Sequence, residues 1–291
     1  MAAKAGESMN AKLEKSLNAI GVNEKVLDVK EITGGSISSA YLVNTKSQRY
    51  FIKWHDEAPT DFFRQEAFGL EFLKEPDALP VPEVYGWGKK FIVMEPVSGN
   101  ATSHSDELLG RGLAALHSVT GTFFGLEEDN YIGELPQGNS WEVSWIDFLR
   151  EQRLRPQIDL ARMLGRLPLE RARKANYILN HLSKWVPKDR QAVKLHGDLW
   201  GGNWITGKKG IPYLIDPAVW YGDYEFELAF TFLFGGFSKR VYDAYGEIIP
   251  ISSEFKERMP LYQLYYLFVH LNIFGEAYGG KVDAILSAYT K

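Results

Sequence analysis

The sequence predicts an α+β protein in two lobes, a strand-rich N-terminal lobe and a larger helical C-terminal lobe. Short runs rich in Val, Ile, Tyr and Phe, separated by turn-forming sequences, dominate the first part of the chain. Helical spacing of apolar residues dominates from about Ser103 onward. The 291 residues leave room for two such units, since a domain usually spans roughly 100–200 residues. We expect lobes over residues 1–97 and 98–291.

The N-terminal lobe is expected to open with a short helix over residues 10–20, because Leu13, Leu17 and Ile20 fall on one helical face and Gly21 follows. Small residues gather in the segment before Met9, and we interpret residues 1–8 as a cloning addition. A second helix is expected over 60–74. Strands are expected over residues 26–32, 40–44, 50–54, 83–87 and 91–95.

The sequence of the C-terminal lobe predicts helices with one short β insertion. Segments such as DELLGRGLAALHSV and LERARKANYILNHLSKWV carry apolar residues at helical spacing. The insertion is expected to be a hairpin over residues 203–206 and 212–215, turning at 207–210. A hinge near residues 95–99 would join the lobes.

Composition excludes several classes of function. Thirty-seven acidic against 33 basic residues give a net charge of −4, which disfavours a nucleic-acid partner. The absence of cysteine excludes disulfides, thiolate nucleophiles, thiol switches and cysteine-containing zinc sites. The six histidines show no zinc-ligand spacing. No secretory signal or membrane-spanning stretch is evident, so we expect a cytoplasmic protein with no membrane partner.

The most informative stretch runs from Leu195 to Asp216 and reads LHGDLWGGNWITGKKGIPYLID. Asp198 is followed by Asn203 after four residues, and Asp216 comes after a predicted hairpin. In kinase-type phosphoryl transfer, one Asp accepts the proton of the acceptor hydroxyl, while an Asn and a second Asp hold Mg²⁺ against the phosphates of ATP. We expect Asp198 to be the catalytic base and Asn203 and Asp216 to bind Mg²⁺. The alternative is that Asp198 only caps a turn and Asp216 only ends a strand.

Such a kinase also needs a lysine on the third strand and an acidic residue on the next helix to orient it. Lys53 lies in the apolar run RYFIKWH, and Glu66 follows in the predicted helix. Glu71 is the rival acid, but it faces another side of that helix. We therefore expect Lys53 to contact the phosphates of ATP and Glu66 to orient Lys53.

The turn GGSIS lies between the first two predicted strands, where a nucleotide-covering loop belongs. Adjacent glycines allow backbone N–H groups to approach phosphates closely. We expect Gly34, Gly35 and Ser36 to contact nucleotide, although a double glycine in a hairpin is often only a turn. Gly202–Lys208 matches the spacing of a P-loop, but Lys209 replaces the required Ser or Thr and the match spans a hairpin, so we regard it as chance.

The absence of protein-kinase motifs indicates what kind of molecule accepts the phosphoryl group. A protein kinase carries HRD, DFG and APE, whereas this chain has HGD and then Asp216-Pro217-Ala218, and lacks APE. Few residues separate Asp216 from the predicted helix that begins near YEFELAF. There is no room for a long peptide-docking segment, so the acceptor should be a small molecule or a protruding adduct.

The sequence resembles the fructosamine (ketosamine) kinases, within the aminoglycoside and choline kinase-like clan. The pattern GG-x-I-S appears as Gly34–Ser38, LHGDLW-x-GN as Leu195–Asn203, DPA-x-x-YG-x-x-EFELA as Asp216–Ala229, and FGGF as Phe234–Phe237. LYQL followed by a histidine, Leu261–His270, and the segment Asn139–Ala161 are also similar. The resemblance covers nearly the whole chain.

This resemblance implies a protein kinase-like fold and ATP-dependent phosphorylation of the sugar 3-hydroxyl of a ketosamine, free or protein-bound. The phosphorylated adduct would then release its amine, which is a deglycation repair. The resemblance also implies that the hinge of Met94, Glu95 and Val97 binds adenine and that Glu225 and Glu227 brace the catalytic loop. Trp200 could support the sugar or could simply pack between the lobes. The competing hypotheses are an aminoglycoside- or choline-type kinase and a non-catalytic nucleotide-binding scaffold.

Overall fold

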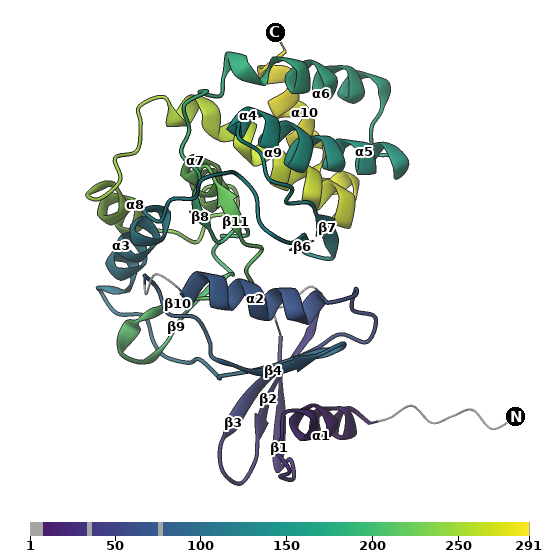
Figure 1. The fold of residues 1–291 in the computed structure, drawn as a ribbon, viewed down its shortest axis with the longest axis vertical. Helices are drawn as coiled ribbons and strands as arrows, with labels where there is room; N and C mark the ends of the chain where they lie inside the picture. The colour runs from purple at the N-terminus through teal and green to yellow at the C-terminus, as the bar shows by residue number, and fades with distance from the viewer. Residues whose placement is uncertain (1–7, 34–36, 75–77, 291) are drawn as a thin grey trace, which may run out of the picture.

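The computed structural model describes residues 8–33, 37–74 and 78–290, and it divides into a sheet-containing N-terminal part and a helical C-terminal part (Figure 1). The sheet has five antiparallel strands in the order β1-β2-β3-β5-β4. Their bounds are β1 Asp28–Ile32, β2 Ser39–Asn44, β3 Arg49–Trp54, β4 Val84–Gly88 and β5 Phe91–Met94.

One helix packs on each face of this sheet. Helix α1, Met9–Ala19, buries Leu13 and Leu17 against the face that carries Tyr50 and Ile52 of β3. Helix α2, Phe62–Lys74, buries Phe63 and Leu70 against the other face and lies between the sheet and the helical part (Figure 1). Strand side chains alternate between faces, so Phe51 and Lys53 of β3 point toward α2.

Among the described residues, the helical part contains eight α-helices, α3 to α10, together with one π-helical stretch. The helices are α3 Ser105–His117, α4 Trp145–Phe148, α5 Arg155–Met163, α6 Leu169–His181, α7 Tyr224–Thr231, α8 Lys239–Gly246, α9 Phe255–Phe274 and, last in the chain, α10 Gly279–Ala288. The π-helical stretch Leu149–Leu154 joins α4 to α5. No helix of the described residues is long and apolar enough to cross a membrane.

The expectation of a single β insertion in the helical part was wrong. The expected hairpin is present as β9, Trp204–Thr206, and β10, Pro212–Leu214. A second hairpin pairs β6, Asn130–Ile132, with β7, Leu135–Gln137, and β8, Val193–Leu195, pairs with β11, Trp220–Gly222. Each of these strands has three residues, which is too short for a period-two pattern to show in the sequence.

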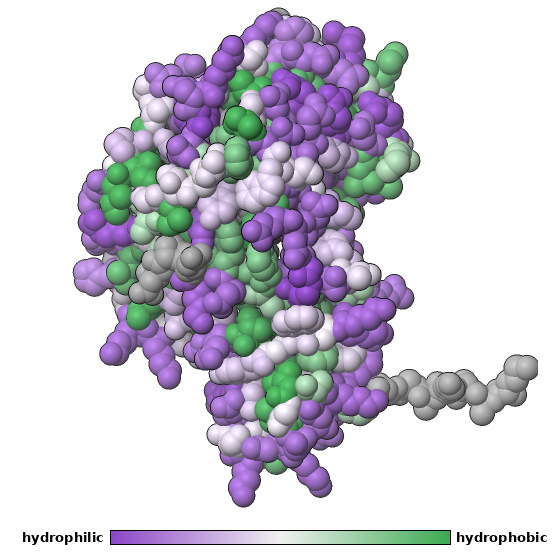
Figure 2. Space-filling view, viewed as in Figure 1, coloured by the Kyte–Doolittle hydropathy of each residue, from purple (hydrophilic) through white to green (hydrophobic). Residues whose placement is uncertain are grey.

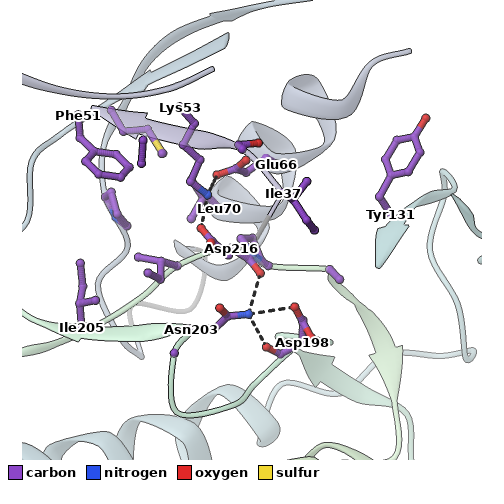
Figure 3. A pocket seen from close by; sticks show the side chains of 18 of the residues that line it. Ile37, Phe51, Lys53, Glu66, Leu70, Tyr131, Asp198, Asn203, Ile205 and Asp216 are labelled. Atoms are coloured by element: carbon purple, nitrogen blue, oxygen red, sulfur yellow. Dashed lines mark hydrogen bonds and ion pairs between the residues drawn. The ribbon is translucent and has the colours of Figure 1, made fainter. Parts of the chain in front are cut away.

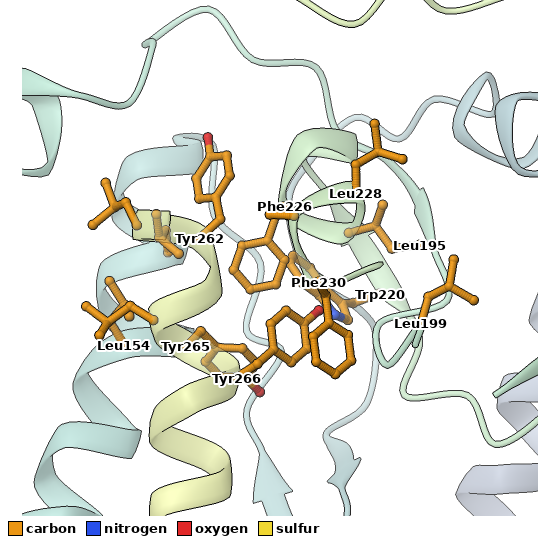
Figure 4. Packing of buried hydrophobic residues seen from close by; sticks show 14 of the residues in the cluster. Leu154, Leu195, Leu199, Trp220, Phe226, Leu228, Phe230, Tyr262, Tyr265 and Tyr266 are labelled. Carbon is orange, nitrogen blue, oxygen red and sulfur yellow. The ribbon is translucent and has the colours of Figure 1, made fainter. Parts of the chain in front are cut away.

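An aromatic core lies behind the segment that carries Asp198 (Figure 4). Phe226 and Phe230 of α7 pack against tyrosines of α9, and the rings of Phe230 and Tyr266 stack with centroids 3.6 Å apart. The Tyr266 hydroxyl donates a hydrogen bond to the backbone oxygen of Gly197 at 2.9 Å. Helix α9 thus supports the loop that carries Asp198. In Figure 2, hydrophilic residues cover most of the visible face, and apolar residues show at the waist between the two parts.

Candidate active site

A cavity of about 550 Å³ lies between the sheet and the segments around Asp198 and Asp216 (Figure 3). Residues from both parts of the molecule line it, which is typical of a ligand site formed between two units. Most of the residues singled out in the sequence contribute to the lining, namely Lys53, Glu66, Met94, Glu95, Val97, Asp198, Trp200, Asn203 and Asp216.

Lys53 is the central cation of this cavity. Its Nζ lies 2.7 Å from Oε1 of Glu66 and also contacts Oδ1 of Asp216. Burial alone would lower the pKa of the Lys53 ammonium, but the carboxylates of Asp216 and Glu66 outweigh it and hold the pKa above its ordinary value. Glu71 instead points to solvent and lies 3.8 Å from Lys74. Of the two candidate acids on α2, Glu66 is therefore the one beside Lys53.

Asp198 and Asn203 face each other on the opposite side of the cavity. The Asn203 Nδ2 donates to the backbone oxygen of Asp198 at 2.7 Å and to its Oδ2 at 3.0 Å. Burial raises the pKa of Asp198 to about 8, and the nearby carboxylate of Asp216 adds to the shift. A raised pKa makes the ionised carboxylate a stronger base than an exposed aspartate.

The β9–β10 hairpin brings Asp216 close to Asn203. The backbone N–H of Ile215 donates to the oxygen of Asn203 at 3.0 Å, which closes the segment between the two residues. Asp216 has a φ of 56°, a left-handed conformation that costs energy for any residue other than glycine and that clusters at functional sites. This backbone conformation directs the Asp216 carboxylate toward Lys53 (Figure 3).

The donor set fits Mg²⁺, which prefers oxygen ligands and keeps few protein ligands when it also binds phosphates. Because the Nδ2 of Asn203 donates to Asp198, its Oδ1 faces away from Asp198 (Figure 3). The Asp216 side chain is 42% exposed within the cavity. Among the described residues, no three His, Asp or Glu side chains cluster as a self-contained metal site.

A buried network behind the cavity holds the backbone of the loop that carries Asp198. Glu227 of α7 accepts hydrogen bonds from the backbone N–H groups of Gly197 at 2.6 Å and His196 at 3.2 Å. His117 of α3 donates to the same carboxylate at 2.8 Å. Burial alone would raise the pKa of Glu227, but the hydrogen bonds from His117 and Gly197 hold it below its usual value. The expected bracing by Glu227 is thus present in the structure.

Glu225 does not brace the loop, contrary to expectation. It accepts two hydrogen bonds from Arg258 at 2.8 and 2.9 Å, 33 residues along the chain. Its neighbour Asp223 is fully buried, where Arg190 and Tyr262 contact it. Asp223 and Glu225 face away from the loop because side chains at neighbouring positions near the beginning of a helix point in different directions. His117, Arg190 and Tyr266 were missed, since their partners lie far away in the sequence.

The remaining predicted residues have different outcomes. Gly34, Gly35 and Ser36 lie outside the described residues, although Ile37 and Ser38 directly after them line the cavity. Trp200 is 39% exposed and also lines it. The P-loop-like match at residues 202–208 contains strand β9 and leads into a hairpin turn, so it lacks the strand-to-helix geometry of a phosphate-binding loop.

Comparisons with known proteins agree with this geometry. The family model described as fructosamine kinase matches residues 8–291. The chain is 38% identical to a probable ketoamine kinase of Enterococcus faecium, over 95% of this chain and 99% of the relative. It is 31% identical to the chloroplastic protein-ribulosamine 3-kinase of Oryza sativa subsp. japonica, over 93% and 81% of the two chains.

Solved structures support the same assignment. A crystal structure assigned as a fructosamine-3-kinase from Thermobifida fusca superposes with a TM-score of 0.85 at 32% identity, covering 98% of this chain and 99% of that one. A choline kinase from Streptococcus pneumoniae, with a TM-score of 0.65 at 16% identity over 97% and 99% of the two chains, shares the fold alone. The α+β, protein kinase-like fold is thereby confirmed, and the chain belongs to the fructosamine kinase family.

Proposed function

We propose that this protein transfers the γ-phosphoryl group of ATP to the sugar 3-hydroxyl of a ketosamine, free or attached to a protein lysine. The observation that carries the proposal is the convergence of Lys53, Glu66 and Asp216 with Asp198 and Asn203 around one cavity. The choice of acceptor is supported by the named relatives, among which the rice protein is a protein-ribulosamine 3-kinase.

In this proposal Asp198 is the general base. It takes the proton of the sugar hydroxyl while that oxygen forms a bond to the γ-phosphorus of ATP and the bond from this phosphorus to the ADP oxygen breaks. Burial raises the pKa of Asp198, which makes its ionised form a stronger base, and the hydrogen bonds with Asn203 fix its orientation. The phosphorylated adduct and ADP then leave.

Lys53 would hold the nucleotide phosphates, and Glu66 would keep its ammonium in place. Asn203 and Asp216 would hold Mg²⁺, which when bound neutralises charge on the phosphates. The backbone N–H of Glu95 already donates to the oxygen of Glu83 at 2.8 Å. The carbonyl of Glu95 and the N–H of Val97 are therefore the hinge groups that we assign to adenine, beside the side chain of Met94.

Trp200 would support the apolar face of the sugar, since its ring is partly exposed and borders the cavity beside Asp198. A cytoplasmic location also belongs to this proposal. The absence of cysteine supports it, because the chain does not depend on an oxidising compartment for disulfides.

The test is to incubate the protein with Mg-ATP and a panel of acceptors and to measure ADP formation. We expect ribulosamine or fructosamine of lysine to exceed choline or an aminoglycoside by at least ~100-fold in kcat/KM, which corresponds to roughly 2.7 kcal/mol in transition-state binding. Equal use of choline or an aminoglycoside would disprove the ketosamine acceptor and leave the kinase assignment standing. No ADP formation with any acceptor would favour a nucleotide-binding scaffold.

A further inference from the structure

The segment Glu128–Asn139, which contains the β6–β7 hairpin and which we call the strap, contacts helix α2 beside the cavity. The carboxylate of Glu128 accepts hydrogen bonds from Arg64 Nη2 at 2.6 Å and from Gln65 Nε2 at 2.9 Å. Gln65 is 8% exposed and directly precedes Glu66 in α2. Glu128 therefore holds the turn of α2 that also carries the partner of Lys53.

The tip of the strap adds further contacts to the same part of the molecule. The Tyr131 hydroxyl donates to the backbone oxygen of Thr60 at 2.8 Å, just before α2 begins. The rings of Tyr131 and Phe62 pack with centroids 5.4 Å apart. Glu134 lies 2.8 Å from the Nε2 of His55, which follows β3. The strap thus reaches both elements that supply the Lys53–Glu66 pair.

The other side of the strap is anchored in the core of the helical part. Asn139 is fully buried, and its Nδ2 donates to the backbone oxygen of Glu128 at 3.1 Å. The buried guanidinium of Arg153 donates to the Asn139 Oδ1 at 2.6 Å and to the oxygen of Gly138 at 2.5 Å. Arg153 also lies 4.1 Å over the ring of Trp220. This end cannot move without breaking buried hydrogen bonds, which is costly.

We propose that the strap keeps α2 in the orientation that pairs Glu66 with Lys53, with Glu128 as the positioning residue. Protein kinases use an activation segment to control the corresponding helix, whereas only seven residues separate Asp216 from α7 here. A hairpin fixed to the core replaces that control with a permanent contact. The inference rests on the proposed role of Lys53 and Glu66 in nucleotide binding. In this view the strap makes that site competent before any partner or modification acts.

The experiment is a double-mutant cycle between Glu128 and Glu66, read as the Kd of Mg-bound AMP-PNP by calorimetry. We expect Glu128→Ala to weaken nucleotide binding about fivefold, since an ion pair with two hydrogen bonds is lost. In the Glu66→Gln background the same change should add less than about twofold, because Glu128 acts through Glu66. Glu128→Gln, which can keep one acceptor, should fall between wild type and Glu128→Ala.

Two further variants separate this role from general stability. Glu127→Ala removes the adjacent exposed carboxylate and should leave the nucleotide Kd unchanged. Arg64→Met removes the other side of the ion pair, should weaken binding to a similar degree, and should not add to Glu128→Ala. Melting temperatures of all variants are compared with their Kd values.

An equal loss of affinity from Glu128→Ala in both backgrounds would overturn the inference. An unchanged Kd for Glu128→Ala would also overturn it, if Glu66→Gln binds the nucleotide more weakly than wild type. If Glu66→Gln itself binds nucleotide normally, the proposed role of Glu66 fails and the inference fails with it. Nucleotide binding needs no acceptor, so an incorrect acceptor assignment would leave these results unaffected.

Discussion

At the scale of single residues, replacing Asp198 by Asn tests the role of its carboxylate as the proton acceptor. Asp198→Asn keeps the size of the side chain and an oxygen that can accept from Asn203, but it removes the proton acceptor. We expect kcat to fall ~10²–10⁴-fold, because this is the usual contribution of a general base, while the KM for ATP stays nearly constant. Steady-state kinetics with a saturating ketosamine would measure both. A variant that keeps more than about a tenth of the wild-type kcat would remove Asp198 from the base role.

Asp216 supports a second prediction at this scale. Asp216→Ala should abolish Mg²⁺-dependent turnover, because we assign its carboxylate as the charged ligand of Mg²⁺ and it also contacts Lys53. The check is the rate of ADP formation over a Mg²⁺ titration. Asp223 is the nearest acid in the sequence, but it is buried against Arg190 and Tyr262 and is not free to replace Asp216. An unaltered Mg²⁺ dependence would contradict the metal assignment.

At the scale of elements, the loop between α7 and α8 packs against the loop that carries Trp200. A Cβ added to Gly236 would lie 2.6 Å from the Cα of Gly201, whereas a Cβ on Gly235 would meet nothing within 4 Å. Both glycines have a left-handed φ, 94° and 74°, so alanine strains the backbone at both positions. The two sites therefore differ mainly in the contact with Gly201.

We predict that Gly236→Ala raises the KM for the acceptor by at least about tenfold, because displacing the Trp200 loop by a fraction of an ångström misplaces the sugar. The KM for ATP should stay unchanged, and Gly235→Ala should leave the acceptor KM close to wild type. Kinetics with each substrate varied in turn would measure these values. A similar acceptor KM in both variants would show that the contact between the two loops does not position Trp200.

At the scale of the whole molecule, His196 links stability to pH. It is fully buried, its Nε2 donates to the oxygen of Ile215 at 2.8 Å, and its Nδ1 accepts from the N–H of Asp198 at 3.2 Å. This arrangement requires the neutral ring, and burial lowers the pKa of His196 below its usual 6.5. A lowered folded-state pKa gives stability that is complete above 6.5 and is lost as pH falls toward the folded value.

We expect the free energy of unfolding to fall below pH 6.5 by up to about 1.4 kcal/mol per pH unit from this group. Urea denaturation of wild type and His196→Gln at pH 7.5 and 5.5 would measure it, with the exposed His104→Gln as control. The decrease should be smaller in His196→Gln and unchanged in His104→Gln. An identical decrease in all three proteins would assign the pH dependence to other groups.

The sequence by itself determined the elements of the N-terminal sheet, the α+β class and the set of polar residues that meet at the cavity. Asp198, Asn203 and Asp216 lie within 19 consecutive positions, and Lys53 and Glu66 lie 13 apart on adjacent elements. Short separations of this kind leave a local signature, because one strand, helix or hairpin sets the geometry. The roles assigned to these residues stay predictions for the experiments above.

Only the tertiary structure decided which residues support the cavity. His117 reaches Glu227 across 110 residues, Gln65 reaches Glu128 across 63, and Glu225 turns to Arg258 instead of the catalytic loop. The strands β6, β7, β8 and β11 have three residues each, and β8 and β11 find their partners only in the folded chain. The physical reason is that such contacts depend on how distant elements pack, and neither periodicity nor spacing in the sequence records that packing.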